Sequence, residues 1–169
     1  ILDANRKVDH ALAAGALALG AKVSVSDRPG YAPLVNSPEL AQAVGEAMRA
    51  LIGEDRVRIT NEWTTGCTDM GDVSCIMPVL HPHIAGAAGK THGHHYHLVD
   101  REMACANSAK GRLLLMALLM ENGAVRAKQV VERYHAPYES KAAYFATLDA
   151  ILRDRELIEY HEDTAQIRL

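Results

Sequence analysis

Residues 63–100 constrain the fold of this chain more than any other part: WTTGCTDMGDVSCIMPVLHPHIAGAAGKTHGHHYHLVD. They include six of the nine histidines, two of the three cysteines and the only tryptophan. A packed core does not require this mixture, because glycine supplies backbone freedom and clustered His and Asp supply titratable or metal-binding groups. We therefore expect two loops, carried on short strands, that form one wall of an active site.

Composition limits the class of protein. At 169 residues the chain makes one domain or a little more, and its hydrophobic fraction of 49% with only 5% aromatic residues favours helix. A net charge of −3 without a basic run argues against nucleic-acid binding. No apolar run approaches the ~18 residues of a membrane span, and no signal peptide is recognisable. Three cysteines without a Cys-x-x-Cys pair indicate a reducing cytoplasm and buried, unreactive thiols.

The first 30 residues predict a helix and a strand. Asp3 is the expected N-cap of a helix that ends at Leu19 before Gly20. Lys22–Asp27 alternates polar and apolar residues, which is typical of a strand with one buried face. The expected buried stripe of the helix is Val8, Leu12, Ala16 and Leu19.

Residues 28–38 carry three prolines and a glycine and mark the expected domain boundary. We divide the chain into residues 1–30 and 31–169. Ser37-Pro38-Glu39 then opens a helix that Gly53 closes. Its expected buried face is Leu40, Val44, Met48 and Leu51.

The rest of the chain predicts short strands followed by helices. Val57–Thr60 and Val73–Met77 are predicted strands, and His81–Ala85 is a possible edge strand because of Pro82. Asp100 should cap a long helix that ends at Asn122-Gly123, with Leu113–Met120 deeply buried. Further helices are expected over residues 126–134 and 139–153, and residues 166–169 are a possible strand.

The histidine-rich segment suggests a metal site. His92, His94, His95 and His97 fall within six residues, and imidazole is the commonest metal ligand in proteins. Alternate side chains of an extended segment point in opposite directions, so at most one or two of these residues share a site. From composition alone, a solvated histidine-rich loop is about as well supported as a metal site.

Asp69 and Asp72 define a second candidate loop around Gly71. These carboxylates suit a metal, a substrate amine or a hydrogen-bonded neighbouring loop, and an ordinary Asp-Gly turn is the alternative. The sequence has neither a Gly-x-Ser-x-Gly nucleophile elbow nor a glycine-rich phosphate loop.

These motifs carry a family resemblance. The runs GCTDMGDVSCIMPVLHPHIAG and THGHHYHLVDREMACANSAK resemble the C-terminal part of an M20-type metal-dependent amidohydrolase, in the branch of aminobenzoyl-glutamate and N-acyl-amino-acid hydrolases. The beginning, NRKVDHALAAGALALGAKVSVSDRPGYAPLVNSPEL, is similar to the end of that family's dimerisation (lid) domain. The resemblance covers residues 4–121 and becomes weak beyond Gly123.

The resemblance implies an α/β fold: part of a twisted sheet with flanking helices, from the catalytic domain of zinc exopeptidases, plus a remnant of an α+β lid. It also implies two divalent ions (zinc, manganese or cobalt), a small-molecule amide substrate and a homodimer formed through the lid. His92 matches the family's final metal ligand, with Tyr96 four residues later. Asp69, Gly71 and Asp72 match its carboxylate loop, and Gly93, His94 or His95 would face the substrate.

The departures from the family concern the catalytic base and the other ligands. The chain has no Glu-Glu pair, and its only His-x-Asp is His161-Glu162-Asp163. We therefore expect a fragment, inactive alone, of an enzyme whose general base and remaining ligands lie elsewhere. The alternative is a non-catalytic metal-binding or interaction module that uses residues 92–97.

Overall fold

The computed structural model describes residues 2–60, 62 and 64–169, so Trp63 lies outside the described residues. It divides into two compact units. Unit 1 comprises residues 1–30 and 142–169, and unit 2 comprises residues 31–141. The first division falls inside the predicted boundary at residues 28–38. Residues 142–169, which the sequence division placed with residues 31–141, cluster with the N-terminal residues instead.

Both helices and strands are present, so the chain is mixed α/β. Among the described residues the strands form three two-stranded antiparallel pairs: β1 with β4, β2 with β3, and β5 with β6. In the described part of the chain, the isolated bridge between Asn36 and Val79 is parallel. No described helix is both long and apolar enough to cross a membrane.

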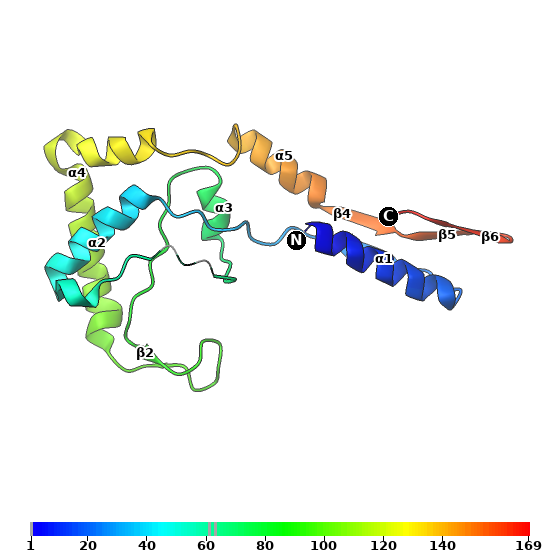
Figure 1. Ribbon diagram of the computed structural model, residues 1–169, viewed down its shortest axis with the longest axis horizontal. Coiled ribbons are helices and arrows are strands. Elements are labelled where there is room, and N and C mark those ends of the chain that lie inside the picture. The colour runs from blue at the N-terminus through cyan, green and yellow to red at the C-terminus, as the bar shows by residue number, and fades with distance from the viewer. Residues whose placement is uncertain (1, 61, 63) are drawn as a thin grey trace. The chain divides into compact units, whose positions relative to one another are not determined.

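Unit 1 packs a helix against strands (Figure 1). Helix α1 (Leu2–Ala18) precedes β1 (Ser24–Asp27), and α5 (Lys141–Ile151) leads into the remaining strands. These are β4 (Arg153–Glu156), β5 (Ile158–His161) and β6 (Thr164–Ile167). Leu157 and Ile158 are fully buried against Ala13 and form the small core with the partly buried Ala16, Val23 and Val25.

The helix and strand predicted for the first 30 residues are confirmed, but the buried face of the helix is not the predicted one. Val8, Leu12 and Leu19 are exposed, whereas Asp9 and Ala13 are buried. Asp9 accepts a hydrogen bond from Arg155 Nη2 at 2.6 Å, and Asp27 accepts one from the same atom at 2.7 Å. This ion network, rather than the apolar stripe, therefore faces the strands. Asp3 lies within α1 rather than at its cap.

Unit 2 is built around α2 (Pro38–Ile52) and α4 (Ser108–Glu132), which pack together. Ser37 caps α2 as predicted, since its Oγ accepts from Leu40 N–H at 3.3 Å, and Gly53 closes it. A short 3-10 turn, η1 (Glu54–Arg56), follows. Leu40, Val44, Met48 and Leu51 are only partly buried, and the fully buried positions of α2 are Ala43, Gly45 and Ala47.

The long helix begins with a π-helical segment, η2 (Glu102–Asn107), and continues as α4. Asp100 caps it, because Oδ1 accepts from Met103 N–H at 2.9 Å. Non-helical dihedral angles over residues 121–124 break α4 at the predicted Asn122-Gly123, and Figure 1 shows its two parts running in different directions.

The predicted burial of residues 113–120 is wrong in this chain. Leu113, Met116 and Met120 are 60–69% exposed. An apolar helix face is buried only where another element covers it, and among the described residues α2 covers the side of Gly111 instead.

Three predicted strands are absent from the described residues. Residues 57–60 and 81–85 have no strand pairing, and Val73–Met77 falls largely in α3 (Met70–Ser74) and the turn after it. Local hydrogen bonds explain the helix: Val73 N–H donates to the Asp69 carbonyl at 3.2 Å, and Ser74 Oγ donates to the Gly71 carbonyl at 2.6 Å. Such short-range bonds compete with strand pairing.

Candidate functional site

The two predicted loops lie in unit 2, one on the short helix α3 and the other on a β-hairpin. α3 carries Asp69 at its N-terminal boundary and Gly71 and Asp72 within it. The hairpin pairs β2 (Ala87–Ala88) with β3 (His97–Leu98). The histidine-rich segment is therefore the connection at the tip of a hairpin.

Asp72 and Gly71 hold α3 against the segment that follows the unit boundary. Asp72 Oδ1 accepts from Ala32 N–H at 2.9 Å. A Cβ on Gly71 would overlap the Ala32 carbonyl oxygen, so only glycine allows this approach. Asp72 was considered as a metal ligand, as a partner of a substrate amine or as a hydrogen-bond acceptor for a neighbouring loop, and this contact directly supports the last of these roles. Asp69, in contrast, is exposed and makes no side-chain capping bond to α3.

Ser74 and Tyr134 anchor the other end of α3. Ser74 is completely buried, and its Oγ accepts from Val35 N–H at 3.2 Å. The Tyr134 hydroxyl donates to the Ser74 carbonyl oxygen at 2.7 Å and so fastens α3 to the end of α4. Tyr134 was not singled out from the sequence, because this contact spans 60 residues and leaves no local pattern.

Cys75 lies beside this anchor. Its Sγ donates to the Gly71 carbonyl oxygen at 3.5 Å, and the side chain is buried. Burial, with a smaller contribution from the Asp72 charge, raises the pKa of the Cys75 thiol. Burial and the neighbouring Cys75 raise the pKa of Tyr134. Both groups therefore stay neutral, and Cys75 fits the predicted unreactive thiol, whereas Cys67 and Cys105 are exposed.

His81 connects the residues just before α3 to the bridge between Asn36 and Val79. Its Nδ1 is hydrogen-bonded to Thr68 Oγ1 at 3.2 Å, and its backbone N–H donates to Asn36 Oδ1 at 3.0 Å. His81 thus has a structural role beside the carboxylate loop. Its ring stacks on that of His83, with the ring centroids 6.0 Å apart.

Glycines position the hairpin. Gly86 is buried with a φ of +118°, and a Cβ there would lie 2.6 Å from the Asp100 carbonyl oxygen. Its own carbonyl accepts from Val99 N–H at 2.9 Å and from Asp100 N–H at 3.1 Å. The base of the hairpin is therefore fixed to Asp100, the residue that caps the long helix.

The histidines of the hairpin are all exposed. His92 has a φ of +63°, an uncommon conformation for a residue other than glycine. The rings of His94 and His95 have centroids 3.7 Å apart. His97 Nδ1 donates to the His95 carbonyl oxygen at 2.7 Å.

These residues do not by themselves form a metal centre. Among the described residues, no group of three or more His, Cys, Asp or Glu side chains is arranged to hold an ion. A catalytic zinc site normally has three protein ligands. His92 offers one exposed imidazole, so a two-ion site does not fit the residues present without ligands from elsewhere.

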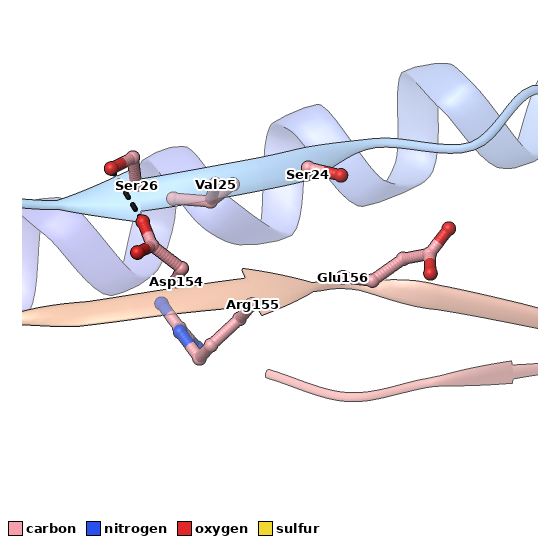
Figure 2. A pocket seen from close by; sticks show the side chains of 6 residues that line it. All are labelled: Ser24, Val25, Ser26, Asp154, Arg155 and Glu156. Carbon is pink, nitrogen blue, oxygen red and sulfur yellow. Dashed lines mark hydrogen bonds between the residues drawn. The ribbon is translucent and has the colours of Figure 1, made fainter.

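Two hollows in the surface are lined by none of the predicted site residues. In unit 1, a shallow hollow of about 300 Å³ lies over β1 and β4, where Ser26 donates to Asp154 at 2.6 Å (Figure 2). The hydrogen bond from Ser26, together with Arg28, lowers the pKa of Asp154. In unit 2, a hollow of about 210 Å³ lies between α2 and α4, next to the ion pair of Arg126 and Glu46.

Comparison with known proteins identifies no relative: no family model, curated protein or solved structure matches this chain.

Proposed function

We propose that the chain is part of a metal-dependent amidohydrolase similar to the M20 type. The substrate would be an N-acyl amino acid, an aminobenzoyl-glutamate-like compound or a small peptide. The observation that carries the proposal is the hairpin with its histidine-rich tip, which leads directly into a helix capped by Asp100. The resemblance places the final metal ligand, His92, at this position.

The carboxylate loop supports the same proposal through its packing. Asp72 holds the backbone at Ala32, and Gly71 allows the close approach that this requires. In the proposed enzyme, Asp72 would shape the site rather than bind an ion. The ions would be zinc, manganese or cobalt, and the general base and other ligands would come from outside this sequence. We assign no catalytic step to the residues present.

The test begins with the coding sequence contiguous with this chain. A His-x-Asp motif and a Glu-Glu pair there, with hydrolysis of N-acyl amino acids by the complete enzyme plus a divalent ion, would support the proposal. The 169-residue chain alone should not exceed a metal-free control, because it lacks the base. Turnover by the chain alone would contradict the fragment hypothesis.

Histidine variants of the complete enzyme test the site itself. His92→Ala should lower metal occupancy and reduce activity by orders of magnitude, because a ligand helps to generate the nucleophile. His81→Ala, His83→Ala and His97→Ala should have much smaller effects; His83→Ala and His97→Ala serve as controls, whereas His81→Ala also removes the hydrogen bond to Thr68. At least one of the His94→Ala and His95→Ala variants should weaken substrate binding more than metal binding. If His92→Ala keeps its metal and turnover while one of these two loses its metal, the ligand is misassigned.

The second candidate function is a non-catalytic metal-binding or interaction module. The exposure of residues 92, 94, 95 and 97 together on one hairpin favours it. The missing Glu-Glu pair is consistent with such a module. Zinc binding by the 169-residue chain, with no hydrolase motifs in the contiguous coding sequence, would favour the module over the enzyme.

A further inference from the structure

Asn122 and Gly123 lie together at the break in α4. Asn122, Gly123 and Ala124 have φ values of +51°, +73° and +61°, so none of them has helical geometry. Asn122 and Gly123 are exposed, and a Cβ built on Gly123 meets none of the surrounding atoms within 4 Å. The backbone between these two residues therefore has open space beside it and lies outside regular helix.

An asparagine followed by glycine is chemically labile, and the reaction needs only the chain and water. The backbone nitrogen of the glycine attacks the side-chain carbon Cγ, a C–N bond forms, and the bond from Cγ to Nδ2 breaks. The Nδ2 group leaves as ammonia with the proton of the backbone nitrogen, and a cyclic succinimide remains. Water then opens the ring at either carbonyl carbon, which gives isoaspartate or aspartate without oxidation or reduction. Glycine favours ring closure because it has no Cβ to hinder the attack and lets the backbone rotate.

Asn36 also precedes a small residue, but hydrogen bonds hold the backbone there. The N–H of Ser37, which would be the attacking nitrogen, donates to the Val79 carbonyl oxygen at 2.8 Å. The Asn36 side-chain oxygen Oδ1 accepts from His81 N–H at 3.0 Å. Ring closure at Asn36 therefore requires local opening of both hydrogen bonds.

Asn107 is held by helical geometry. It has φ and ψ of −69° and −33° at the N-terminal boundary of α4, and the N–H of the following Ser108 donates to the Cys105 carbonyl oxygen. Asn5 lies within α1 and precedes a bulky arginine. Among the described asparagines, Asn122 alone combines a glycine neighbour with an exposed, non-helical backbone.

From these observations we propose that Asn122 and Gly123 form a self-modification site, at which the folded chain converts Asn122 into isoaspartate and aspartate without an enzyme. The proposal does not depend on amidohydrolase activity. The new carboxylate lies next to Glu121, whose Oε1 is 3.8 Å from Arg126 Nε. Isoaspartate also adds one carbon atom to the main chain between the two parts of α4. The modification therefore changes both the charge and the backbone length at this break.

Mass spectrometry of the 169-residue chain, kept at physiological pH and temperature, follows the reaction. Trypsin separates Asn36, Asn107 and Asn122 into the peptides 23–49, 102–110 and 113–126. Peptide 113–126 should gain about 1 Da, after a succinimide species about 17 Da lighter than the parent peptide. The other two peptides should react at least about tenfold more slowly, because their backbone N–H groups are released only by local opening. Isoaspartate methyltransferase should label the aged parent chain but not the aged Asn122→Gln variant.

The same chain unfolded in guanidinium chloride separates the effect of the fold from that of the sequence. Unfolding should accelerate the reaction at Asn36 and Asn107 and change the rate at Asn122 by less than about threefold. If the folded chain keeps Asn122 intact while the unfolded chain loses it, the break protects this asparagine and the proposal is overturned. Equal rates at all three asparagines in the folded chain would also overturn it, since the fold would then not select Asn122.

Discussion

Tyr134→Phe removes one hydroxyl and tests how α3 is held in place. The Tyr134 hydroxyl donates to the Ser74 carbonyl oxygen at 2.7 Å, and Ser74 is completely buried. Losing a hydrogen bond of this kind costs about 0.5–1.5 kcal/mol, and leaving a buried carbonyl without its partner costs more. We expect a loss of about 1–2 kcal/mol in the free energy of unfolding of unit 2.

Cys75 provides a local reporter of the same contact. It is buried and directly follows Ser74 in the turn after α3, whereas Cys67 and Cys105 are exposed. With the exposed pair replaced by serine, thiol labelling follows the opening of this segment. A loss of about 1.4 kcal/mol in local stability should raise the labelling rate about tenfold in Tyr134→Phe, provided that opening is a rapid equilibrium.

Urea unfolding measures the global effect alongside the labelling rate. Tyr96→Phe is the matched control, because Tyr96 is 51% exposed on the hairpin loop, and it should change neither quantity. If Tyr134→Phe also leaves both the labelling rate and the urea midpoint unchanged, the hydroxyl does not fasten α3 to α4, and the positioning argument for Ser74 is refuted.

Three further predictions concern unit 2. Ala124→Gly should raise the free energy of unfolding by about 1 kcal/mol, because Ala124 has a φ of +61° that favours glycine. Ala109→Gly, at an exposed position inside a helix, should instead lower the free energy of unfolding by about 1 kcal/mol, and urea unfolding of both variants measures these opposite changes. The pKa values of Cys75 and Tyr134 are raised in the folded state, which favours the neutral form of each side chain. Their contribution to the free energy of unfolding is therefore complete below roughly pH 9 and is lost as the pH rises through the pKa values of the folded state. The midpoint of urea unfolding should therefore fall between pH 8 and pH 11. It should fall less in the double variant Cys75→Ala, Tyr134→Phe than in the parent chain. Gly111→Val should destabilise by about 1–3 kcal/mol, because a Cβ there meets the sulfur atom of Met48; a thermal melt equal to that of the parent chain would contradict this packing.

Local sequence determined where several helices begin and end. Ser37 with Pro38 starts α2, Asp100 caps the long helix, and Asn122-Gly123 breaks it, all as predicted. Each of these signals acts through hydrogen bonds or dihedral angles within a few residues. The mixed α/β class and the loop-like character of the histidine-rich segment follow from the same short-range information.

Burial and strand pairing were decided by contacts between distant residues. Arg155 pairs with Asp9 across 146 residues, and this network places Asp9 rather than Val8 against the strands. The periodicity of apolar residues shows which residues share a helix face, but not which face another element covers. Leu113 illustrates this, because it was predicted to be buried and is exposed.

In the candidate site, too, local sequence signals and contacts between distant residues determined different features. Residue type and neighbourhood suggested Asp72 as a site residue, whereas the choice of His92 among four neighbouring histidines came from the family resemblance and stays a prediction. Only the tertiary structure showed that Asp72 holds the backbone of Ala32 and that Tyr134 secures the end of α3. A hydrogen bond between segments 40 or 60 residues apart depends on how the chain packs, and no local pattern in the sequence encodes it.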